Sequence, residues 1–250
     1  MISYETVKKV LFKFQPETAH NIAEFGLKTL GKCFILKNIM EKENYIEAKG
    51  GDGTLIKAIH KFKDKNKPFF GIAAGTFNFM MNDEDNIDPN CTYQKLYLME
   101  VNVEYKENNL IKNEIVYAFN DVIVGEFNAW IEFDCIDEDD ILGKFLGAGV
   151  LISTTQGSTG ANKNNNGTIL PLSSRNWSVT GVQVNRNINY VIESNNELTI
   201  NCTSRGNIKI NVDGTYFEKS NVSKVTLKRG PIVEVIFNDI KKFKKKRQQN

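Results

Sequence analysis

The chain has 250 residues, of which 41% are hydrophobic and 25% are charged, as is ordinary for a soluble globular protein. This length can bury a large core in one large domain or in two modest ones. The formal charge of +2 predicts no strong bulk attraction to nucleic acid, and no apolar run approaches the ~20 residues of a membrane span.

The N-terminus lacks the apolar block of a signal peptide, and no two cysteines form a CxxC pair. Widely spaced thiols are typical of reduced cytoplasmic proteins, so we expect a cytoplasmic chain with neither a disulfide framework nor a zinc site. The two histidines, His20 and His60, are also far apart, which disfavours Ser-His-Asp and multi-histidine metal chemistry. The cysteines are Cys33, Cys91, Cys135 and Cys202.

Hydrophobic spacing predicts helices within residues 3–31, divided at Pro16, and then a β-α-β unit. The unit comprises a strand at 45–48, a helix at about 54–64 and a strand at 68–72. Parallel strands joined by a helix place a ligand at the carboxyl ends of the strands. We therefore expect a site just after the first strand of this unit.

The glycine turn, Lys49-Gly50-Gly51-Asp52-Gly53-Thr54, stands at that point. Glycines before a helix let backbone N–H groups approach a phosphate closely. A carboxylate repels phosphate, so Asp52 indicates contact with a hydroxyl, a metal or both, as the acceptor side of phosphoryl transfer requires. The alternative is a plain loop in which Asp52 caps the following helix.

Beyond residue 92, apolar and polar residues alternate with period two, which predicts a second domain built of strands. We therefore expect an α/β domain over residues 1–92 and a β-rich, nucleotide-binding domain over residues 93–230. Whether residues 231–250 pack back on the first domain is left open. The basic run at 241–247 is more typical of a solvated, frayed terminus than of contact with RNA or an anionic surface.

Three further segments carry polar groups in positions that suit a ligand. Residues 71–79 form a strand that ends in small residues, and Asn120-Asp121 lies between apolar strand residues, where its hydrogen bonds must be met by protein or ligand. Residues 153–160, Ser-Thr-Thr-Gln-Gly-Ser-Thr-Gly, form what we call the hydroxyl turn. Taken alone, the Asn-Asp pair is more typical of a β-turn or bulge, and the hydroxyl turn of an exposed loop.

Taken together and in this order, these segments resemble the NAD kinases, the enzymes that phosphorylate the adenosine-ribose 2′-hydroxyl of NAD to make NADP. The similarity runs from about residue 45 to 237. The matching motifs are GGDGT at 50–54, Gly-Thr-x-Asn-Phe at 75–79, Asn120-Asp121 for the family's Asn-Glu pair, STTQGSTGANK at 153–163 and Val212-Asp213-Gly214. The resemblance implies a Rossmann-like α/β domain at the N-terminus and a β-sandwich domain at the C-terminus.

The resemblance also implies roles for residues that match the motifs. Asp52 would orient or deprotonate the ribose 2′-hydroxyl. The binding residues implied are Gly51, Gly53 and Thr54 on the phosphate-bearing side, Asn78 and Phe79 near the adenosine, Asn120 and Asp121 as its hydrogen-bonding partners, and Ser158 and Thr159 as further nucleotide contacts.

The family implies NAD and ATP, or sometimes polyphosphate, as ligands, with a divalent metal, usually Mg²⁺, held largely by phosphates. No dedicated metal-ligand cluster is visible in the sequence. A homodimer or homotetramer is implied as well, and neither nucleic acid nor a membrane is expected as a partner.

The chain departs from the family pattern at two positions. Ala148 stands where the family has an acidic residue, and Ala161 stands where it usually has tyrosine. We expect a wider or less polar base pocket in consequence. Two alternatives remain open: a lipid kinase of the diacylglycerol type, which shares GGDGT, and an NAD(P)-binding protein that has lost catalysis.

Overall fold

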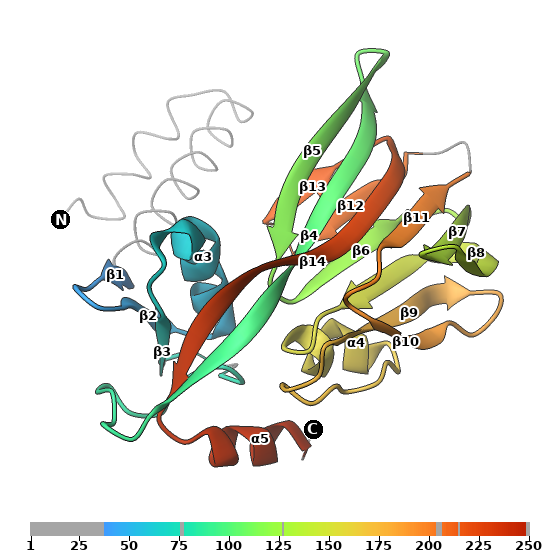
Figure 1. The fold of residues 1–250 in the computed structure, drawn as a ribbon. Coiled ribbons are helices and arrows are strands. Elements are labelled where there is room, and N and C mark those ends of the chain that lie inside the picture. The colour runs from blue at the N-terminus through green and yellow to red at the C-terminus, as the bar shows by residue number, and fades with distance from the viewer. Residues whose placement is uncertain (1–37, 76–77, 127, 204–206, 215, 249–250) are drawn as a thin grey trace, which may run out of the picture.

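The computed structural model describes residues 38–75, 78–126, 128–203, 207–214 and 216–248 (Figure 1). The helices expected within residues 3–31 lie outside the described residues, as do His20 and Cys33. In the described part, no helix has the length and apolar character that crossing a membrane requires. The described cysteines are free, and Cys135 is buried.

The β-α-β unit predicted from the sequence is confirmed. Strand β2 (Ile46–Gly50) leads through the glycine turn into helix α3 (Asp52–Phe62), and β3 (Phe69–Ala73) returns parallel to β2. A short strand, β1 (Ile39–Glu41), pairs antiparallel with β2 on its outer side. The turn η1 (Lys63–Lys65) follows α3. The carboxyl end of β2 therefore opens directly onto Asp52.

The remainder of the described chain is rich in strands, joined mostly as antiparallel pairs. Its elements are β4 (Thr92–Glu107), β5 (Leu110–Ala118), β6 (Asp121–Gly125), β7 (Ile131–Asp137), β8 (Asp140–Ser153), η2 (Gly157–Thr159), α4 (Ala161–Asn164), β9 (Asn176–Val184), β10 (Asn189–Glu193), β11 (Leu198–Cys202), β12 (Lys209–Val212), β13 (Phe217–Lys219), β14 (Val222–Phe237) and α5 (Ile240–Gln248). The fold class predicted from the sequence, an α/β part followed by a β-rich part, is confirmed.

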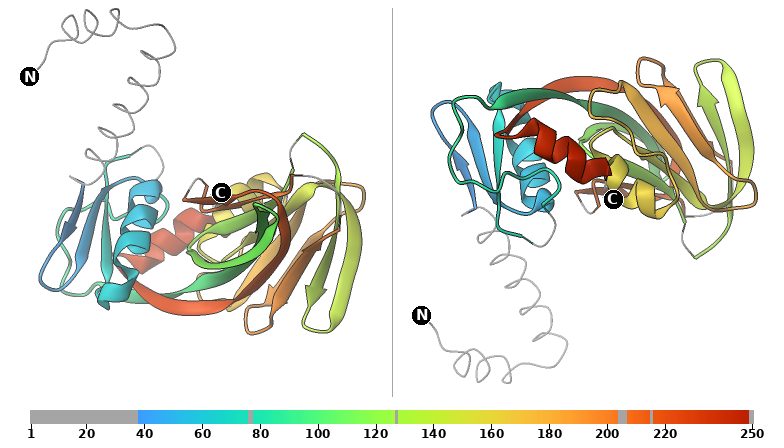
Figure 2. Two further views of the ribbon diagram at one scale, coloured as in Figure 1. Left: turned by 90° about the horizontal axis from the view of Figure 1, so that it is seen from above. Right: turned by 90° about the horizontal axis from the view of Figure 1, so that it is seen from below.

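Two long strands connect the parts. Strand β14 pairs antiparallel with β4 along most of its length, and its last residues pair parallel with β3 of the α/β part. Its first residues pair with β11 of the β-rich part. Figure 2 shows β4 and β14 running from one part to the other. The division at residues 92 and 230 stays a prediction, because the two parts share these strands.

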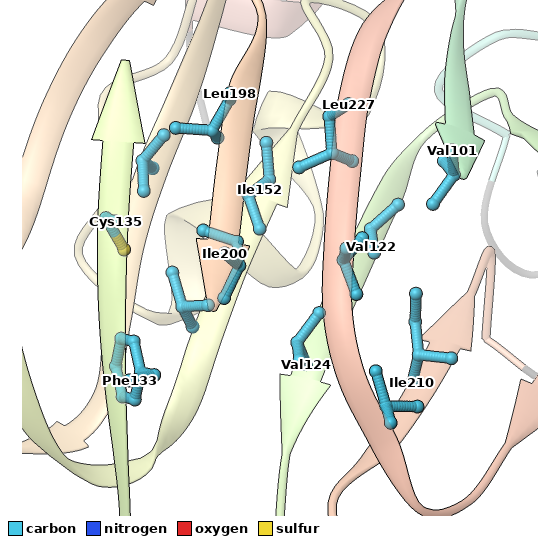
Figure 3. Close-up of a cluster of buried hydrophobic side chains, with 14 of the residues drawn as sticks. Val101, Val122, Val124, Phe133, Cys135, Ile152, Leu198, Ile200, Ile210 and Leu227 are labelled. Carbon is cyan, nitrogen blue, oxygen red and sulfur yellow. The ribbon is translucent and has the colours of Figure 1, made fainter. Parts of the chain in front are cut away.

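Each part has its own hydrophobic core. In the β-rich part, alternate residues of several strands point inward, and Figure 3 shows Val122, Val124, Phe133, Ile152 and Ile200 among them. The core of the α/β part gathers apolar side chains of β2, α3 and β3 with those of both long strands. Burial of these two cores stabilises the fold at about 25 cal/mol per Å² of apolar surface removed from water.

The basic C-terminal segment is not a frayed tail, so the interpretation from its charge was wrong. It forms α5, and Asp239, the residue before this helix, caps its N-terminus. The Asp239 carboxylate accepts hydrogen bonds from the N–H groups of Lys241 and Lys242, each at 2.9 Å. Phe243 is buried with its ring centroid 4.5 Å from that of Phe237. The charge pattern concealed these apolar and capping positions, which hold the helix against the α/β part.

Candidate active site

The glycine turn brings β2, α3 and the segment after β3 into close contact. Gly51 is the N-cap of α3 and Asp52 its first residue, so Asp52 does not cap the helix. The Gly51 carbonyl accepts a hydrogen bond from the Thr54 N–H at 2.8 Å. A Cβ on Gly75 would lie 2.7 Å from the Gly51 nitrogen, so the turn at Gly75 needs glycine to come this near.

The Asp52 carboxylate holds the chain that follows Gly75. Its Oδ2 accepts a hydrogen bond from the Phe79 N–H at 2.9 Å, and its Oδ1 accepts one from the Met80 N–H at 2.8 Å. Within the same loop, the Asn78 amide donates to the Gly75 carbonyl at 2.7 Å. An ionised carboxylate can accept up to about four hydrogen bonds, so these two do not by themselves exclude a ligand hydroxyl. Asp52 therefore has a structural role whatever else it does.

Gly53 differs from its neighbours, because a Cβ built there meets nothing within 4 Å. It is exposed in the first turn of α3, where an alanine would favour the helix more than glycine does. Packing within this chain would therefore allow a side chain at position 53, and does not explain why glycine stands there. The open space lies at a helix N-terminus, where backbone N–H groups and the helix dipole favour an anion.

Asp213 organises the Asn120-Asp121 segment. Its carboxylate accepts backbone N–H hydrogen bonds from Phe119 at 2.7 Å, Asn120 at 2.7 Å and Asp121 at 3.0 Å. The Asp213 side chain is fully buried, and these donors satisfy it. Val212-Asp213-Gly214 matched the family motif, but its function as an anchor for residues 119–121 was not predicted.

His60 is a second partner of Asp213 that the sequence reasoning missed. It lies in α3, is buried, and its Nε2 stands 2.7 Å from Asp213 Oδ2. The Tyr216 ring stacks on the imidazole with centroids 3.4 Å apart. This contact could not be predicted from the position of a single histidine in a helix, because its partner lies 153 residues further along the chain. The pair joins the α/β part to the β-rich part close to the site.

Burial and the neighbouring Asp213 charge act together on Asp121, the first residue of β6. Burial is the larger cause, and together they raise the pKa of the Asp121 carboxyl from 3.8 to about 7. A carboxyl group that titrates near neutral pH can change between hydrogen-bond donor and acceptor in the physiological range. Burial among protein groups is enough to account for this shift.

The hydroxyl turn is buried, contrary to the exposed loop that its composition alone suggests. Thr154 Oγ1 donates to the carbonyls of Phe119 at 2.6 Å and Asn120 at 2.9 Å, which are alternative or shared acceptors for one proton. Gln156 Nε2 donates to the Phe119 carbonyl at 2.6 Å. A Cβ on Gly157 would collide with the Asn120 carbonyl, so only glycine permits this approach. The turn and the Asn-Asp segment therefore form one unit.

Within the turn, Ser158 and Thr159 occupy different environments. The Ser158 hydroxyl is fully buried: it donates to the Thr155 carbonyl at 2.8 Å and accepts from the Leu170 N–H at 2.9 Å. Arg247 of α5 also donates to it, at 3.1 Å. Thr159 instead lines a cavity. A nucleotide contact through the Ser158 hydroxyl, as opposed to its backbone, would compete with these protein hydrogen bonds.

A small cavity of about 50 Å³ marks where the separate motifs meet. Its walls come from α3, the segment after β3, the link between β5 and β6, and the hydroxyl turn. Its lining residues are Asp52, Ile56, Phe79, Met80, Phe119, Asn120, Gln156, Gly157, Thr159 and Gly160. Four of the residues predicted from the sequence are thus brought together. The others, Gly51, Gly53, Thr54, Asn78, Asp121 and Ser158, lie on the same segments without lining this cavity.

The two positions that depart from the family pattern are not part of the cavity lining either. Ala148 is buried in β8, and Ala161 is exposed at the first residue of α4. Their expected effect on a base pocket stays a prediction. Among the described residues, no three His, Cys, Asp or Glu side chains gather into a group that could hold a metal ion.

The likeness to known proteins agrees with the motifs. No family model matches the chain. The chain is 31% identical over 157 residues to the NAD kinase of Mycoplasmoides gallisepticum, a match that covers 58% of this chain and 54% of the relative. Over this stretch the chain is similar to an NAD kinase.

The fold comparison points the same way. Yeast NADH kinase, in a crystal structure with NADH, superposes with a TM-score of 0.68 at 16% identity, over 78% of this chain and 63% of that one. The NAD kinase of Archaeoglobus fulgidus, in a crystal structure with ATP, gives a TM-score of 0.63 at 14% identity, over 80% and 79%. These likenesses establish the NAD kinase fold. The chain spans about half the length of the first curated NAD kinases that it matches.

Proposed function

We propose that this chain is an NAD kinase, which transfers a phosphoryl group from ATP to the adenosine-ribose 2′-hydroxyl of NAD. The observation that carries the proposal is the meeting of Asp52, Phe79, Asn120 and Thr159 in one cavity, although they lie on segments up to 107 positions apart. A plain glycine loop or an isolated Asn-Asp turn gives no reason for this convergence. Support for the nucleotides comes from NADH and ATP in the two similar solved structures.

In this proposal Asp52 accepts the hydrogen bond of the ribose hydroxyl and takes its proton as the phosphoryl group is transferred. Asn120 and Asp121 bind the nucleotide through their side chains, because Asp213 occupies their backbone N–H groups. Gly51, Gly53 and Thr54 receive the phosphate-bearing side at the start of α3, where the helix dipole favours negative charge. Phe79, Asn78, Ser158 and Thr159 complete the binding surface.

We propose that Mg²⁺ enters with ATP, since Mg²⁺ in kinases is bound by one or two carboxylates together with substrate phosphates. The carboxylate that lines the cavity is that of Asp52. When bound, the metal neutralises charge on the transferred phosphoryl group. The protein's own part is to orient the hydroxyl and hold the nucleotide.

A homodimer or homotetramer completes the proposal. Leu110, Ile111 and Ile115 of β5 are large apolar side chains that are exposed in the single chain, at 65%, 70% and 57%. Exposed apolar strand residues favour association with another copy. Light scattering after size exclusion measures the mass directly, and a monomer at micromolar concentration would contradict this part.

The test of the activity is incubation with ATP, Mg²⁺ and NAD, followed by chromatography and mass spectrometry for NADP. Parallel reactions replace NAD by NADH, ATP by polyphosphate, or NAD by vesicles that contain diacylglycerol. We expect NADP or NADPH to form and no phosphorylated lipid. Lipid product alone would support the lipid-kinase alternative, and tight NAD binding without any product would support a silent binding protein.

A further inference from the structure

Arg247 is a buried arginine near the end of α5, with 4% of its surface exposed. Burial lowers the pKa of its guanidinium to about 10, which still leaves it charged at neutral pH. No ion pair recorded among the described residues includes it. A charge buried without a carboxylate partner is costly, so its remaining contacts must compensate.

Those contacts lead to the hydroxyl turn. Nη2 lies 2.6 Å from the Thr155 carbonyl oxygen, 2.9 Å from the Leu170 carbonyl oxygen and 3.1 Å from Ser158 Oγ, so its two N–H groups are shared among three acceptors. Nη1 donates to the Gln156 carbonyl at 3.2 Å. The planar fork of a guanidinium can reach several acceptors at once, which a single ammonium cannot do with the same geometry. Arg247 thus ties the turn to the segment around Leu170.

Phe243 anchors α5 on the α/β part of the molecule. Phe243 packs on Phe237 within the core of the α/β part, and its ring centroid lies 5.9 Å from the Arg247 guanidinium carbon. Figure 2 shows α5 extending from the end of β14 to the neighbourhood of α4. The helix therefore bridges the α/β part, which carries Asp52, and the turn that faces Asp52 across the cavity.

We propose that Arg247 is a positioning residue, which fixes the hydroxyl turn relative to Asp52 for nucleotide binding. The proposal rests on the NAD kinase function given above. Arg247 acts through the carbonyls of Thr155 and Gln156. Gln156, Gly157 and Thr159 of the same turn line the cavity with Asp52. Removal of the guanidinium frees the turn to shift, and small displacements of binding groups have large effects on reactivity.

The test compares Arg247→Gln and Arg247→Lys with Lys242→Gln. Lys242 lies on the same helix, and its exposed side chain forms an ion pair with Asp83 at 2.7 Å instead of bonding to the turn. Lys242→Gln therefore removes one positive charge from α5 and leaves the Arg247 contacts in place. Amide hydrogen exchange of residues 154–170 reports on the turn without any need for activity. We expect it to quicken about tenfold or more in Arg247→Gln, less in Arg247→Lys, and not at all in Lys242→Gln.

Kinetics then separate positioning from general loss of fold. We expect KM for NAD to rise about tenfold or more in Arg247→Gln, and guanidinium ion at tens of millimolar to restore it in part while leaving the wild type unchanged. Unchanged exchange and unchanged KM would overturn the proposal. Equal loss in Lys242→Gln, or loss without rescue and without local change in exchange, would also overturn it. If the wild type forms no NADP but exchange in the turn quickens, the proposed function fails while the anchoring by Arg247 stands.

Discussion

Nε2 of His60 lies 2.7 Å from Oδ2 of Asp213, and this contact joins α3 of the α/β part to the end of β12 in the β-rich part. The same Asp213 carboxylate holds the backbone of residues 119–121. One buried carboxylate therefore sets the position of the Asn-Asp segment relative to the helix that begins at Asp52.

Replacement of Asp213 by asparagine should destabilise the protein strongly. An asparagine keeps one oxygen acceptor but brings an NH₂ group against backbone N–H donors, which leaves buried donors unsatisfied. We expect the free energy of unfolding to fall by about 3 kcal/mol, as for other broken buried networks. Urea unfolding measures this, and Asp140→Asn at the exposed first residue of β8 is the matched control. Equal, small changes in both variants would show that Asp213 is not an anchor.

The ionisation of Asp121 should make stability depend on pH. Because its folded-state pKa is raised from 3.8 to about 7, the native state favours the protonated form. The contribution of Asp121 is fully present below pH 3.8 and is lost as pH rises toward about 7, by at most about 1.4 kcal/mol per pH unit.

Asp121→Asn removes this titration and isolates it from the other groups. Relative to wild type, the variant should gain stability progressively from pH 4 to about 7 and stay level above that, as measured by urea unfolding across the pH range. A difference that is constant from pH 4 to 8 would mean that the Asp121 pKa is not raised.

Gly53 and Gly75 should respond oppositely to alanine, because only one of them is confined by the fold. Gly53→Ala should raise stability by about 0.5–1 kcal/mol, since alanine is the better helix former and meets no neighbour. Gly75→Ala should lower stability by about 1–3 kcal/mol, since its Cβ would press on the backbone of Gly51.

The functional effect of Gly53→Ala tests whether a ligand approaches this glycine. If nucleotide phosphates lie against the start of α3, the added methyl group should lower kcat/KM by about tenfold, or about 1.4 kcal/mol, in a protein that is no less stable. Thermal unfolding and steady-state kinetics on the same preparation give both quantities. An unchanged kcat/KM in Gly53→Ala would show that Gly53 is not part of the binding surface.

The sequence allowed the local elements to be predicted and left the long-range contacts undetermined. Hydrophobic spacing located β2, α3 and β3 within a few residues, because period and glycine placement are local properties. The motifs identified Asp52 and Asn120 in the same way. His60 and Arg247 gave no such signal: their partners lie 153 and 77–92 positions away, and their burial arises only when the chain has folded.

The prediction for the C-terminal segment was wrong because it was based on charge alone. The run at 241–247 has six lysines and arginines and one apolar residue, Phe243, so its solvation was the natural expectation. The structure buries Phe243 and Arg247 on one side of α5 and leaves Lys241, Lys242, Lys244 and Lys245 exposed. Burial of these two residues among the seven holds the helix in place, and the average charge or hydropathy of the segment does not reveal them.

The most direct test of the central claim is NADP formation from ATP, Mg²⁺ and NAD by the wild type and by Asp52→Asn, with NAD binding measured by calorimetry on both. The account predicts NADP from the wild type, and in the variant a kcat lower by about 100-fold or more with NAD affinity nearly retained. The variant also loses one acceptor for the Phe79 and Met80 N–H groups, so its thermal unfolding is recorded alongside to exclude unfolding as the cause. A folded Asp52→Asn protein with wild-type kcat, or a wild type that binds NAD and ATP without forming NADP, would contradict the account.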